Sequence, residues 1–414
     1  MAFTSDIFAS RAAYLGAKLK SKGLQEYTIE EFCKWHGGPE LNCLALEYLM
    51  GCNVLNLARI YELWGKEGCY KSAFAHWLAG MYFTSKGAPC LYMETENKYE
   101  GSLALEVLNG MNAEQFFRLL PVDTVEKMES HLKDNIKWIK DITAKDVVTM
   151  LLMIVDSIGL PSEETNAKFE ENGFHERERP VEALLLTKLF HALPGMMRDL
   201  PLLLIYINHE KKENIKMGGR DVIAAKRSGA DGMKFGQTVS IHLSKREGKA
   251  NKTENYNWVN LKLYKNSVNE SGRDVDMMVI HRQKDVEGTN MHFNIDESDA
   301  FFLATNKDLP REALLNAGVC DVKTATDAGC YSDSITGIKN KPAGVIMAAI
   351  RSDAVKMKKM REVLGITIHK TVPELLADGW FKDKIAKPEA KAEVKPKAAV
   401  KSVPPPVAPK KEGV

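Results

Sequence analysis

The stretch Ala58-Arg-Ile-Tyr-Glu-Leu-Trp-Gly65-Lys-Glu-Gly-Cys-Tyr-Lys71-Ser72 decides the fold. Residues 58–64 form a short, largely apolar run typical of a strand, and residues 71–84 have the length and composition of a helix. Residues 65–72 nearly match the pattern G-x-x-x-x-G-K-[ST], in which backbone N–H groups and a helix N-terminus surround phosphate. Tyr70 replaces the second glycine of that pattern. The strand, loop and helix in succession predict a phosphate-binding turn at the edge of a sheet.

Strand-like and helical patterns alternate on the C-terminal side of this turn. Strands are predicted at 90–95, 147–156 and 202–208, and helices at 122–142 and 180–200. This alternation predicts an α/β core with a mostly parallel sheet. Beyond Gly232, strands predicted at 235–245, 257–265 and 275–282 are expected to extend the sheet in antiparallel fashion, and helices are predicted at 310–317 and 352–364.

We expect four parts in the chain. They are an N-terminal helical, subunit-docking segment at 1–45, an ATPase-like core at 46–290, a small C-terminal α+β domain at 291–385 and a disordered Lys/Ala/Pro-rich tail at 386–414. The tail holds seven Lys and three Glu, so it carries +4 and leaves −2 for the rest of the chain. Such a basic tail either contacts nucleic acid or an acidic partner, or serves as a solubilising extension.

Composition excludes several classes of protein. With 414 residues, 44% hydrophobic and 27% charged, the chain is long enough for a sizeable core. Its apolar runs of about eight residues are far shorter than the ~20 that a membrane span needs. Seven cysteines without a C-x-x-C pair predict neither a disulfide framework nor a zinc site. The N-terminus has some traits of a transit peptide, but a docking amphipathic helix is the favoured interpretation, and a cytoplasmic location is expected.

The pattern of the phosphate loop predicts a role for several of its residues. Lys71 is expected to reach the β- and γ-phosphates of a nucleotide, and the Ser72 hydroxyl to occupy a position on Mg²⁺. Cys69 is either a small loop residue or a thiol that makes nucleotide binding sensitive to oxidation. The loop residues expected to bind the cofactor are Gly65, Lys66, Glu67, Gly68, Cys69, Tyr70, Lys71 and Ser72.

The ends of the following strands supply candidate catalytic groups. Asp156 ends an apolar strand, where ligands of α/β sheets bind, and is expected to hold Mg²⁺ or to cap the next helix. Glu96 follows the strand at 90–95 and is expected to orient or deprotonate the attacking water, with Glu94 in a supporting position. Asn208 and His209 end the strand at 202–208, and His209 is expected to sense the γ-phosphate.

In combination, these residues resemble the RecA recombinase family, and in particular its phage UvsX-like branch. The resemblance covers roughly residues 40–285 and rests on six motifs, which are GKEGCYKS (65–72), METEN (93–97), MIVDSIG (153–159), LIYINHE (204–210), SGADGMKF (228–235) and LYKNS (263–267). The branch also has an aromatic residue before the loop lysine, as Tyr70 stands here.

The resemblance implies an ATP- and Mg²⁺-dependent DNA recombinase with a RecA-like P-loop ATPase core. Glu96 matches the family's catalytic carboxylate, Lys71 and Ser72 its phosphate and Mg²⁺ contacts, and Asp156 its second Mg²⁺-binding acid. His209 matches the residue that couples the γ-phosphate to a DNA-binding loop. The family binds ATP between subunits of a helical filament, and Lys234 and Lys265 are the candidates for basic residues supplied by a neighbouring subunit.

The resemblance also implies two DNA-binding loops, within 159–180 and 210–231. The second is read as a flexible cationic loop around Gly218-Gly219, and the first is otherwise acidic. The candidate DNA contacts are Phe174, Arg177, Arg179, Lys211, Lys212, Ile215, Lys216, Arg220, Lys226 and Arg227.

The expected partners are single-stranded and double-stranded DNA, other copies of the chain, a single-strand-binding protein and a loading mediator, in the cytoplasm of a phage-infected bacterial host. The basic tail departs from the acidic tail common in the family. Two alternatives remain open. A hexameric helicase is disfavoured because only about 55 residues precede the loop strand, and a non-hydrolysing mediator because Lys71, Ser72, Glu96 and Asp156 are all present.

Overall fold

The computed structural model describes most of the chain from residue 37 to residue 377. The described ranges are 37–83, 87–96, 107–108, 116–143, 150–159, 181–217, 220–227, 233–246, 256–267, 271–280, 292–324 and 330–377. Most of the predicted N-terminal segment, and the basic tail, lie outside these ranges.

The first half of the described chain alternates strands with helices, as the sequence predicts. Its elements are β1 (Gly37–Gly38), α3 (Leu44–Met50), β2 (Arg59–Gly65), α4 (Lys71–Leu78), η1 (Ala79–Phe83), β3 (Cys90–Glu94), β4 (Phe117–Pro121), α7 (Val125–Thr143), β5 (Leu151–Asp156), α9 (Val181–Met197), β6 (Leu202–Met217) and β7 (Arg220–Arg227).

The second half first completes the large sheet and then forms a mixed region. Its elements are α10 (Met233–Gly236), β8 (Val239–Arg246), β9 (Tyr256–Asn266), β10 (Asp274–Ile280), β11 (His292–Asn294), α11 (Ile295–Thr305), α12 (Arg311–Asn316), β12 (Val322–Thr324), β13 (Cys330–Asp333), β14 (Ile338–Pro342), α13 (Ala343–Arg351), α14 (Ala354–Val363), β15 (Lys370–Thr371) and α15 (Val372–Ala377).

The protein is an α/β protein built on a large mixed, mostly parallel sheet. Within the described residues, nine of its strands follow the order β11-β10-β9-β8-β2-β6-β5-β3-β4. The strands from β8 to β4 are parallel neighbours, whereas β9, β10 and β11 are added in antiparallel fashion. The prediction of a parallel core with an antiparallel extension is therefore confirmed, except that β8 itself pairs parallel with β2.

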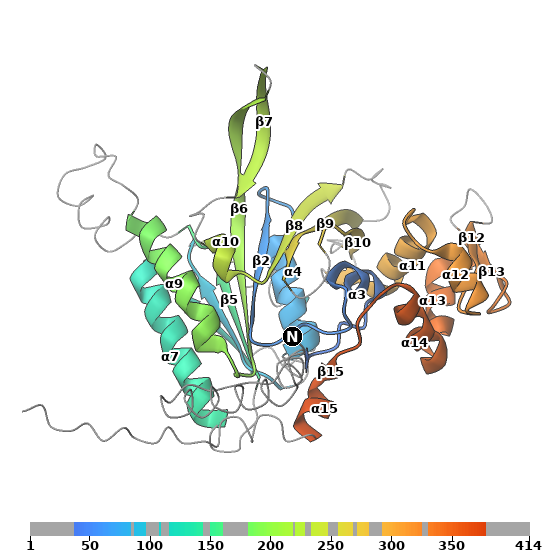
Figure 1. Cartoon of the computed structure of the whole chain (residues 1–414), viewed down its shortest axis with the longest axis horizontal. Helices are drawn as coiled ribbons and strands as arrows, with labels where there is room; N and C mark the ends of the chain where they lie inside the picture. The colour runs from blue at the N-terminus through green and yellow to red at the C-terminus, as the bar shows by residue number, and fades with distance from the viewer. Residues whose placement is uncertain are drawn as a thin grey trace, which may run out of the picture.

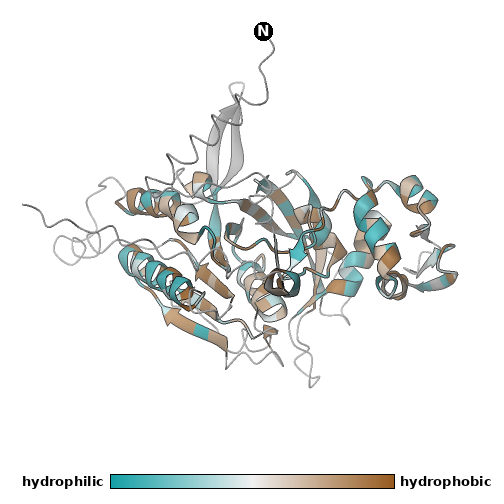
Figure 2. Ribbon diagram, turned by 60° about the horizontal axis from the view of Figure 1, so that its bottom comes forward, coloured by the Kyte–Doolittle hydropathy of each residue, from teal (hydrophilic) through white to brown (hydrophobic). Residues whose placement is uncertain are grey.

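Both faces of the parallel strands are buried, which explains their nearly continuous apolar sequences. Alternate residues of β5 and β6 pack into two separate clusters, so that Leu203 and Ile205 face one side while Leu204 and Tyr206 face the other. Helices α7 and α9 cover the second side, as the left-hand part of Figure 1 shows. Their polar residues lie outward, and the apolar strands are sandwiched between the layers (Figure 2).

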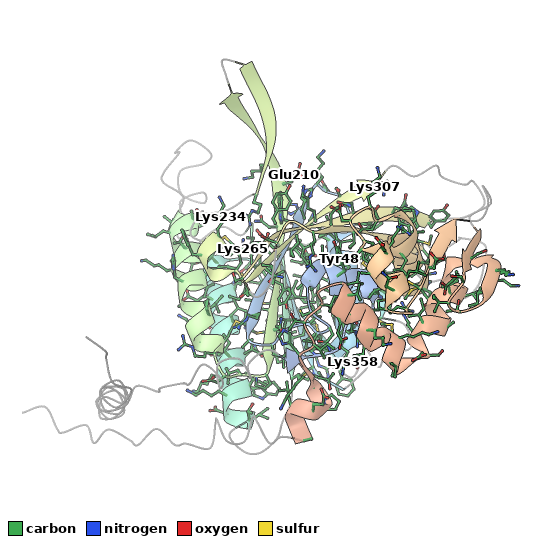
Figure 3. The ribbon with its side chains drawn as sticks, turned by 45° about the vertical axis from the view of Figure 1, so that its right-hand side comes forward. Tyr48, Glu210, Lys234, Lys265, Lys307 and Lys358 are labelled. Carbon is green, nitrogen blue, oxygen red and sulfur yellow. The ribbon has the colours of Figure 1, made fainter. Side chains whose placement is uncertain are left out.

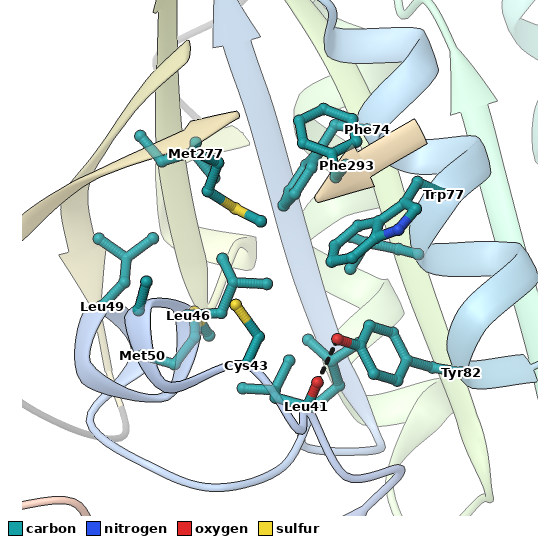
Figure 4. Packing of buried hydrophobic residues seen from close by; sticks show 14 of the residues in the cluster. Leu41, Cys43, Leu46, Leu49, Met50, Phe74, Trp77, Tyr82, Met277 and Phe293 are labelled. Carbon is teal, nitrogen blue, oxygen red and sulfur yellow. Dashed lines mark hydrogen bonds between the residues drawn. The ribbon is translucent and has the colours of Figure 1, made fainter. Parts of the chain in front are cut away.

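Helix α4 and helix α3 belong to the cluster on the opposite face of the sheet. There Phe74 and Trp77 of α4 pack against Phe293, with ring centroids 5.2 Å apart in both pairs. The Tyr82 hydroxyl donates a hydrogen bond to the carbonyl of Leu41 beneath them (Figure 4). This core fixes the start of α4, and with it the loop that precedes the helix.

Strand β6 continues well past the sheet and pairs with β7 as an antiparallel hairpin. The pairing runs from Glu210 opposite Arg227 to Met217 opposite Arg220, and the hairpin projects from the end of the sheet (Figure 1). The sequence interpretation of 210–231 as a flexible loop was wrong for the described residues of this segment.

Other differences concern elements with weak sequence signals. Strand β4 lies at the sheet's edge beyond β3, so two strands rather than one separate β2 from β5 along the chain. Its segment is short, and Arg118 interrupts its apolar residues, so it lacks the continuous apolar run of β5 and β6. Strands β12, β13 and β14 form a small separate sheet within the region predicted as α+β, where the sequence pattern located no individual strand.

Two buried carboxylates, each paired with an arginine, join α3 to the C-terminal region, and we call this contact the seam. Arg361 of α14 donates two hydrogen bonds, each 2.8 Å, to Glu47 of α3. Arg351 of α13 binds Asp299 of α11, whose carboxylate also accepts from the main-chain N–H groups of Leu44 and Ala45 at 2.8 Å. Asp299 thereby caps α3 from more than 250 residues away, because the N-cap residue makes no side-chain cap of its own.

None of the helices in the described parts of the chain combines the length and apolar character that a bilayer crossing requires.

Candidate functional site

The loop from β2 to α4 folds around the side chain of its own lysine. Lys71 Nζ donates to the carbonyl oxygens of Gly65 and Lys66, at 3.0 and 2.7 Å, and its side chain is buried. Gly65 has φ +154°, and a Cβ there would lie 2.1 Å from the carbonyl oxygen of Leu243. Only glycine fits this position, so the first glycine of the predicted pattern has a steric cause.

Tyr70 occupies the position where the usual loop pattern has glycine. Its backbone is left-handed, with φ 67° and ψ 23°, which costs a non-glycine residue about 1 kcal/mol. The Tyr70 hydroxyl accepts a hydrogen bond of 2.8 Å from Asn257 Nδ2, and Lys245 Nζ lies 6.0 Å from the ring centre. Burial raises the pKa of Tyr70. These contacts with β8 and β9 offset the backbone cost.

Ser72 and Asp156 meet at the start of α4 and the end of β5. The Ser72 hydroxyl donates to Asp156 Oδ2 at 2.5 Å, and the Tyr92 hydroxyl donates to the same oxygen. Burial raises the pKa of the Asp156 carboxyl, while the two hydroxyl hydrogen bonds act in the opposite direction. A hydroxyl and a carboxylate side by side are the hard oxygen donors that Mg²⁺ prefers, so the pair fits such an ion. The described residues contain no group of three or more His, Cys, Asp or Glu side chains placed to hold a metal.

Glu96 is held at the same edge of the sheet by two hydrogen bonds to one oxygen. His209 Nε2 and Ser157 Oγ each lie 2.6 Å from Glu96 Oε1, and since a carboxylate accepts, both groups donate. The side chains of Glu96 and His209 are 28% and 38% exposed, so solvent reaches both. The carboxylate is therefore fixed in direction and accessible.

Supporting residues position Glu96 through its main chain. Glu94 is buried, and its Oε1 accepts from the N–H of Glu96 at 3.0 Å, so the predicted supporting role fits its position. Thr95 Oγ1 donates to the carbonyl of Ser157 and accepts from its N–H, both at 2.6 Å. Sequence reasoning missed Thr95 and Ser157 because single hydroxyl residues after a strand are common in loops.

We call this group of strand ends the carboxyl edge. The structure brings together there Lys71, Ser72, Glu96, Asp156 and His209, five of the residues that the sequence singled out. Asn208, the polar residue beside His209 at the strand end, points to the other face of the sheet, where its Nδ2 donates to Glu62 Oε1 at 3.0 Å. Alternation along a strand makes it impossible for both side chains to face one ligand.

The candidate DNA contacts divide between the hairpin and the undescribed segments. Lys211 is exposed near the hairpin base, and Lys212, Ile215, Lys216, Arg220 and Lys226 occupy backbone positions along β6 and β7. Arg227 ends β7, where it forms an ion pair of 2.6 Å with Glu62. Phe174, Arg177 and Arg179 lie outside the described residues.

Lys234 and Lys265 lie next to each other, at the end of the sheet from which the hairpin rises (Figure 3). Lys265 Nζ donates to the carbonyl oxygens of Lys234 and Gln237, at 2.6 and 2.7 Å, and so holds the end of α10. Burial lowers the pKa of Lys265, and the nearby charge of Arg227 acts in the same direction. A role toward a neighbouring subunit remains a prediction for both lysines.

The fold and the carboxyl edge define an α/β protein with a lysine-containing loop and an ordered carboxylate at adjoining strand ends. Comparison with models of known protein families finds no match, and comparison with curated proteins finds none either.

Proposed function

We propose that the protein is an ATP-dependent DNA recombinase of the RecA type, similar to the phage UvsX-like branch. It assembles as a helical filament on single-stranded DNA and promotes homologous pairing and strand exchange. The observation that carries the proposal is the direct hydrogen bond from His209, at the base of the β6–β7 hairpin, to Glu96. This contact joins a candidate hydrolytic carboxylate to the segment expected to bind DNA.

The loop residues Gly65 to Ser72 hold the nucleotide phosphates. Lys71 Nζ now binds two loop carbonyl oxygens, so the ammonium already lies inside the loop, where it neutralises phosphate charge. Ser72 and Asp156 would hold the Mg²⁺ that accompanies ATP, and the ion would stabilise the charge of the transferred phosphoryl group.

Glu96 orients the attacking water and accepts its proton. Two donors on Oε1, from His209 and Ser157, hold the carboxylate in one direction. Any displacement of His209 changes one of those two hydrogen bonds. The position of the hairpin base therefore depends on the hydrogen bonds that Glu96 makes.

The hairpin supplies the contacts to DNA. Along its backbone lie Lys211, Lys212, Lys216, Arg220 and Lys226, and such cations bind phosphates with little dependence on base sequence. A projecting pair of strands presents these residues away from the core (Figure 1).

Self-assembly draws on the surface beside α10. Phe235 is 75% exposed there, next to Lys234, and an aromatic side chain so exposed is suited to burial against a second copy of the chain. In a filament, Lys234 and Lys265 would contribute to the nucleotide site of the neighbouring subunit.

Electron microscopy with single-stranded DNA and a non-hydrolysable ATP analogue tests the proposal. Helical filaments that require both ligands are the expected result. Closed rings would instead favour a translocating motor. DNA binding without any ATP turnover would favour a non-hydrolysing mediator.

Two substitutions separate the roles of the carboxyl edge. Lys71→Ala should abolish nucleotide binding, whereas Glu96→Gln should retain binding and lower DNA-stimulated hydrolysis at least about 100-fold. Glu129→Gln, on α7 and paired with Lys133 away from the carboxyl edge, is the control and should change neither. Normal turnover by Glu96→Gln would exclude Glu96 as the hydrolytic carboxylate.

A further inference from the structure

A second polar cluster lies on the face of the sheet opposite the phosphate loop. Its centre is Glu62 of β2, whose side chain is only 3% exposed. Glu62 Oε2 accepts from Arg227 Nη1 and from Ser240 Oγ, both at 2.6 Å. Glu62 Oε1 accepts from Asn208 Nδ2 at 3.0 Å. One buried carboxylate therefore joins β2, β6, β7 and β8.

Asn208 connects this cluster to the opposite face. While its Nδ2 donates to Glu62, its Oδ1 accepts from the N–H of His209 at 2.8 Å. The His209 side chain in turn donates to Glu96 on the loop side of the sheet. Three hydrogen bonds, joined by the covalent skeleton of His209, thus connect Glu62 to Glu96 across the sheet.

Arg227 connects the cluster to the hairpin. It is the last residue of β7, it pairs with Glu210 across the hairpin base, and its guanidinium lies 5.5 Å from the ring centre of Trp64. A buried carboxylate that loses its guanidinium partner is strongly disfavoured, because the remaining charge is left desolvated and less well paired. The return strand of the hairpin is therefore fixed at its base by charge as well as by strand pairing.

We propose that Glu62 is a positioning residue that links the base of the hairpin to Asn208 and His209. Through it, the placement of Arg227 and the placement of His209 depend on each other. The inference rests on the proposed function, since it gives the route by which nucleotide at one face changes DNA binding by the hairpin. Glu62 touches neither the phosphate loop nor the exposed part of the hairpin.

The test compares DNA affinity in two nucleotide states. For each variant, the dissociation constant for single-stranded DNA is measured with a non-hydrolysable ATP analogue and with ADP. The coupling is the dissociation constant with ADP divided by that with the analogue. Glu62→Gln should lower this ratio by about 5- to 100-fold. DNA-free ATP hydrolysis should stay within about twofold of the unaltered protein, because the groups at the loop remain.

Glu47→Gln is the matched control, because it also removes the charge of a buried glutamate paired with an arginine. It should lower thermal stability as Glu62→Gln does and leave the coupling unchanged. Should Glu62→Gln fail to fold, Glu62→Gln/Arg227→Gln leaves no unpaired charge and should fold with the coupling lost. Tryptic cleavage in the hairpin should depend on the nucleotide in the unaltered protein and not in these variants.

The outcomes distinguish the inference from the proposed function. If the unaltered protein binds DNA equally well with either nucleotide, the proposed function fails and the inference with it. If the unaltered protein shows coupling and Glu62→Gln retains it, or if Glu47→Gln loses it equally, only the role of Glu62 is overturned.

Discussion

The carboxyl edge and the seam both keep acidic side chains close together, but they bind them with different partners. At the seam, Glu47 and Asp299 are fully buried, and their carboxylates bind arginines and main-chain N–H groups. At the carboxyl edge, Glu96 and Asp156 accept hydrogen bonds from hydroxyl groups and one imidazole. Separating the guanidinium pairs of the seam would leave fully buried charges and is costly, whereas hydroxyl and imidazole partners can be exchanged for water, metal or phosphate.

The largest effect is expected from removing a partner at the seam. Arg351→Met leaves the buried Asp299 without its guanidinium, and the free energy of unfolding should fall by about 3–5 kcal/mol. Urea denaturation measures it. Lys133→Met, which removes an exposed pair on α7, is the control and should cost less than about 0.5 kcal/mol. Equal losses in the two variants would show that the seam does not stabilise the fold.

Lowering the pH should reduce the free energy of unfolding through His76, in the helix that follows the phosphate loop. His76 Nδ1 lies 2.7 Å from the carbonyl of Ser72 and donates to it, and burial lowers the pKa of His76 from 6.5 to about 4. The unfolded chain takes up this proton near pH 6.5 and the folded protein only near pH 4. Stability is therefore lost as the pH falls through that window, by about 3 kcal/mol.

Urea denaturation at a series of pH values checks this prediction. His76→Gln removes the titrating group and should give a flatter profile between pH 6.5 and 4. His191→Gln, on the exposed side of α9, should keep the profile of the unaltered protein. An unchanged slope in His76→Gln would assign the acid sensitivity to other groups.

A smaller effect is expected at the loop itself. Tyr70→Phe removes the hydrogen bond from Asn257 and should lower the free energy of unfolding by about 1 kcal/mol. Asn257→Ala made in the Tyr70→Phe background should cost much less than Asn257→Ala alone. Additive losses would mean that Tyr70 and Asn257 contribute independently.

The smallest expected effect on stability is at Asp156, where a substitution should not destabilise the protein, unlike the loss of an arginine at the seam. Burial disfavours the charged form of Asp156, so Asp156→Asn should leave stability unchanged or raise it by up to about 1 kcal/mol. The same variant should lose Mg²⁺-dependent nucleotide binding, measured by calorimetry. A large loss of stability would place Asp156 with the structural carboxylates of the seam.

Local patterns predicted much of the core and the residues of the carboxyl edge. Apolar runs located β2, β3, β5 and the first half of β6, and polar residues at their ends marked Glu96, Asp156 and His209. Contacts between distant segments were not predictable in this way. Asn257 supports Tyr70 across 187 positions, and Glu62 meets Arg227 across 165, so no local spacing signals either pair.

Strand β6 runs without interruption from the core into the hairpin, and this continuity restricts how the protein can vary in length. Asn208 and His209 reach opposite faces because successive residues of a strand alternate. One residue inserted into β6 before Asn208 would exchange the faces and bring the wrong side chain to Glu96. Insertions matched on both strands of the hairpin, beyond Lys211 and before Lys226, leave that order intact. Natural variation in the reach of the hairpin is therefore expected toward its tip, in paired steps, with a base of constant length.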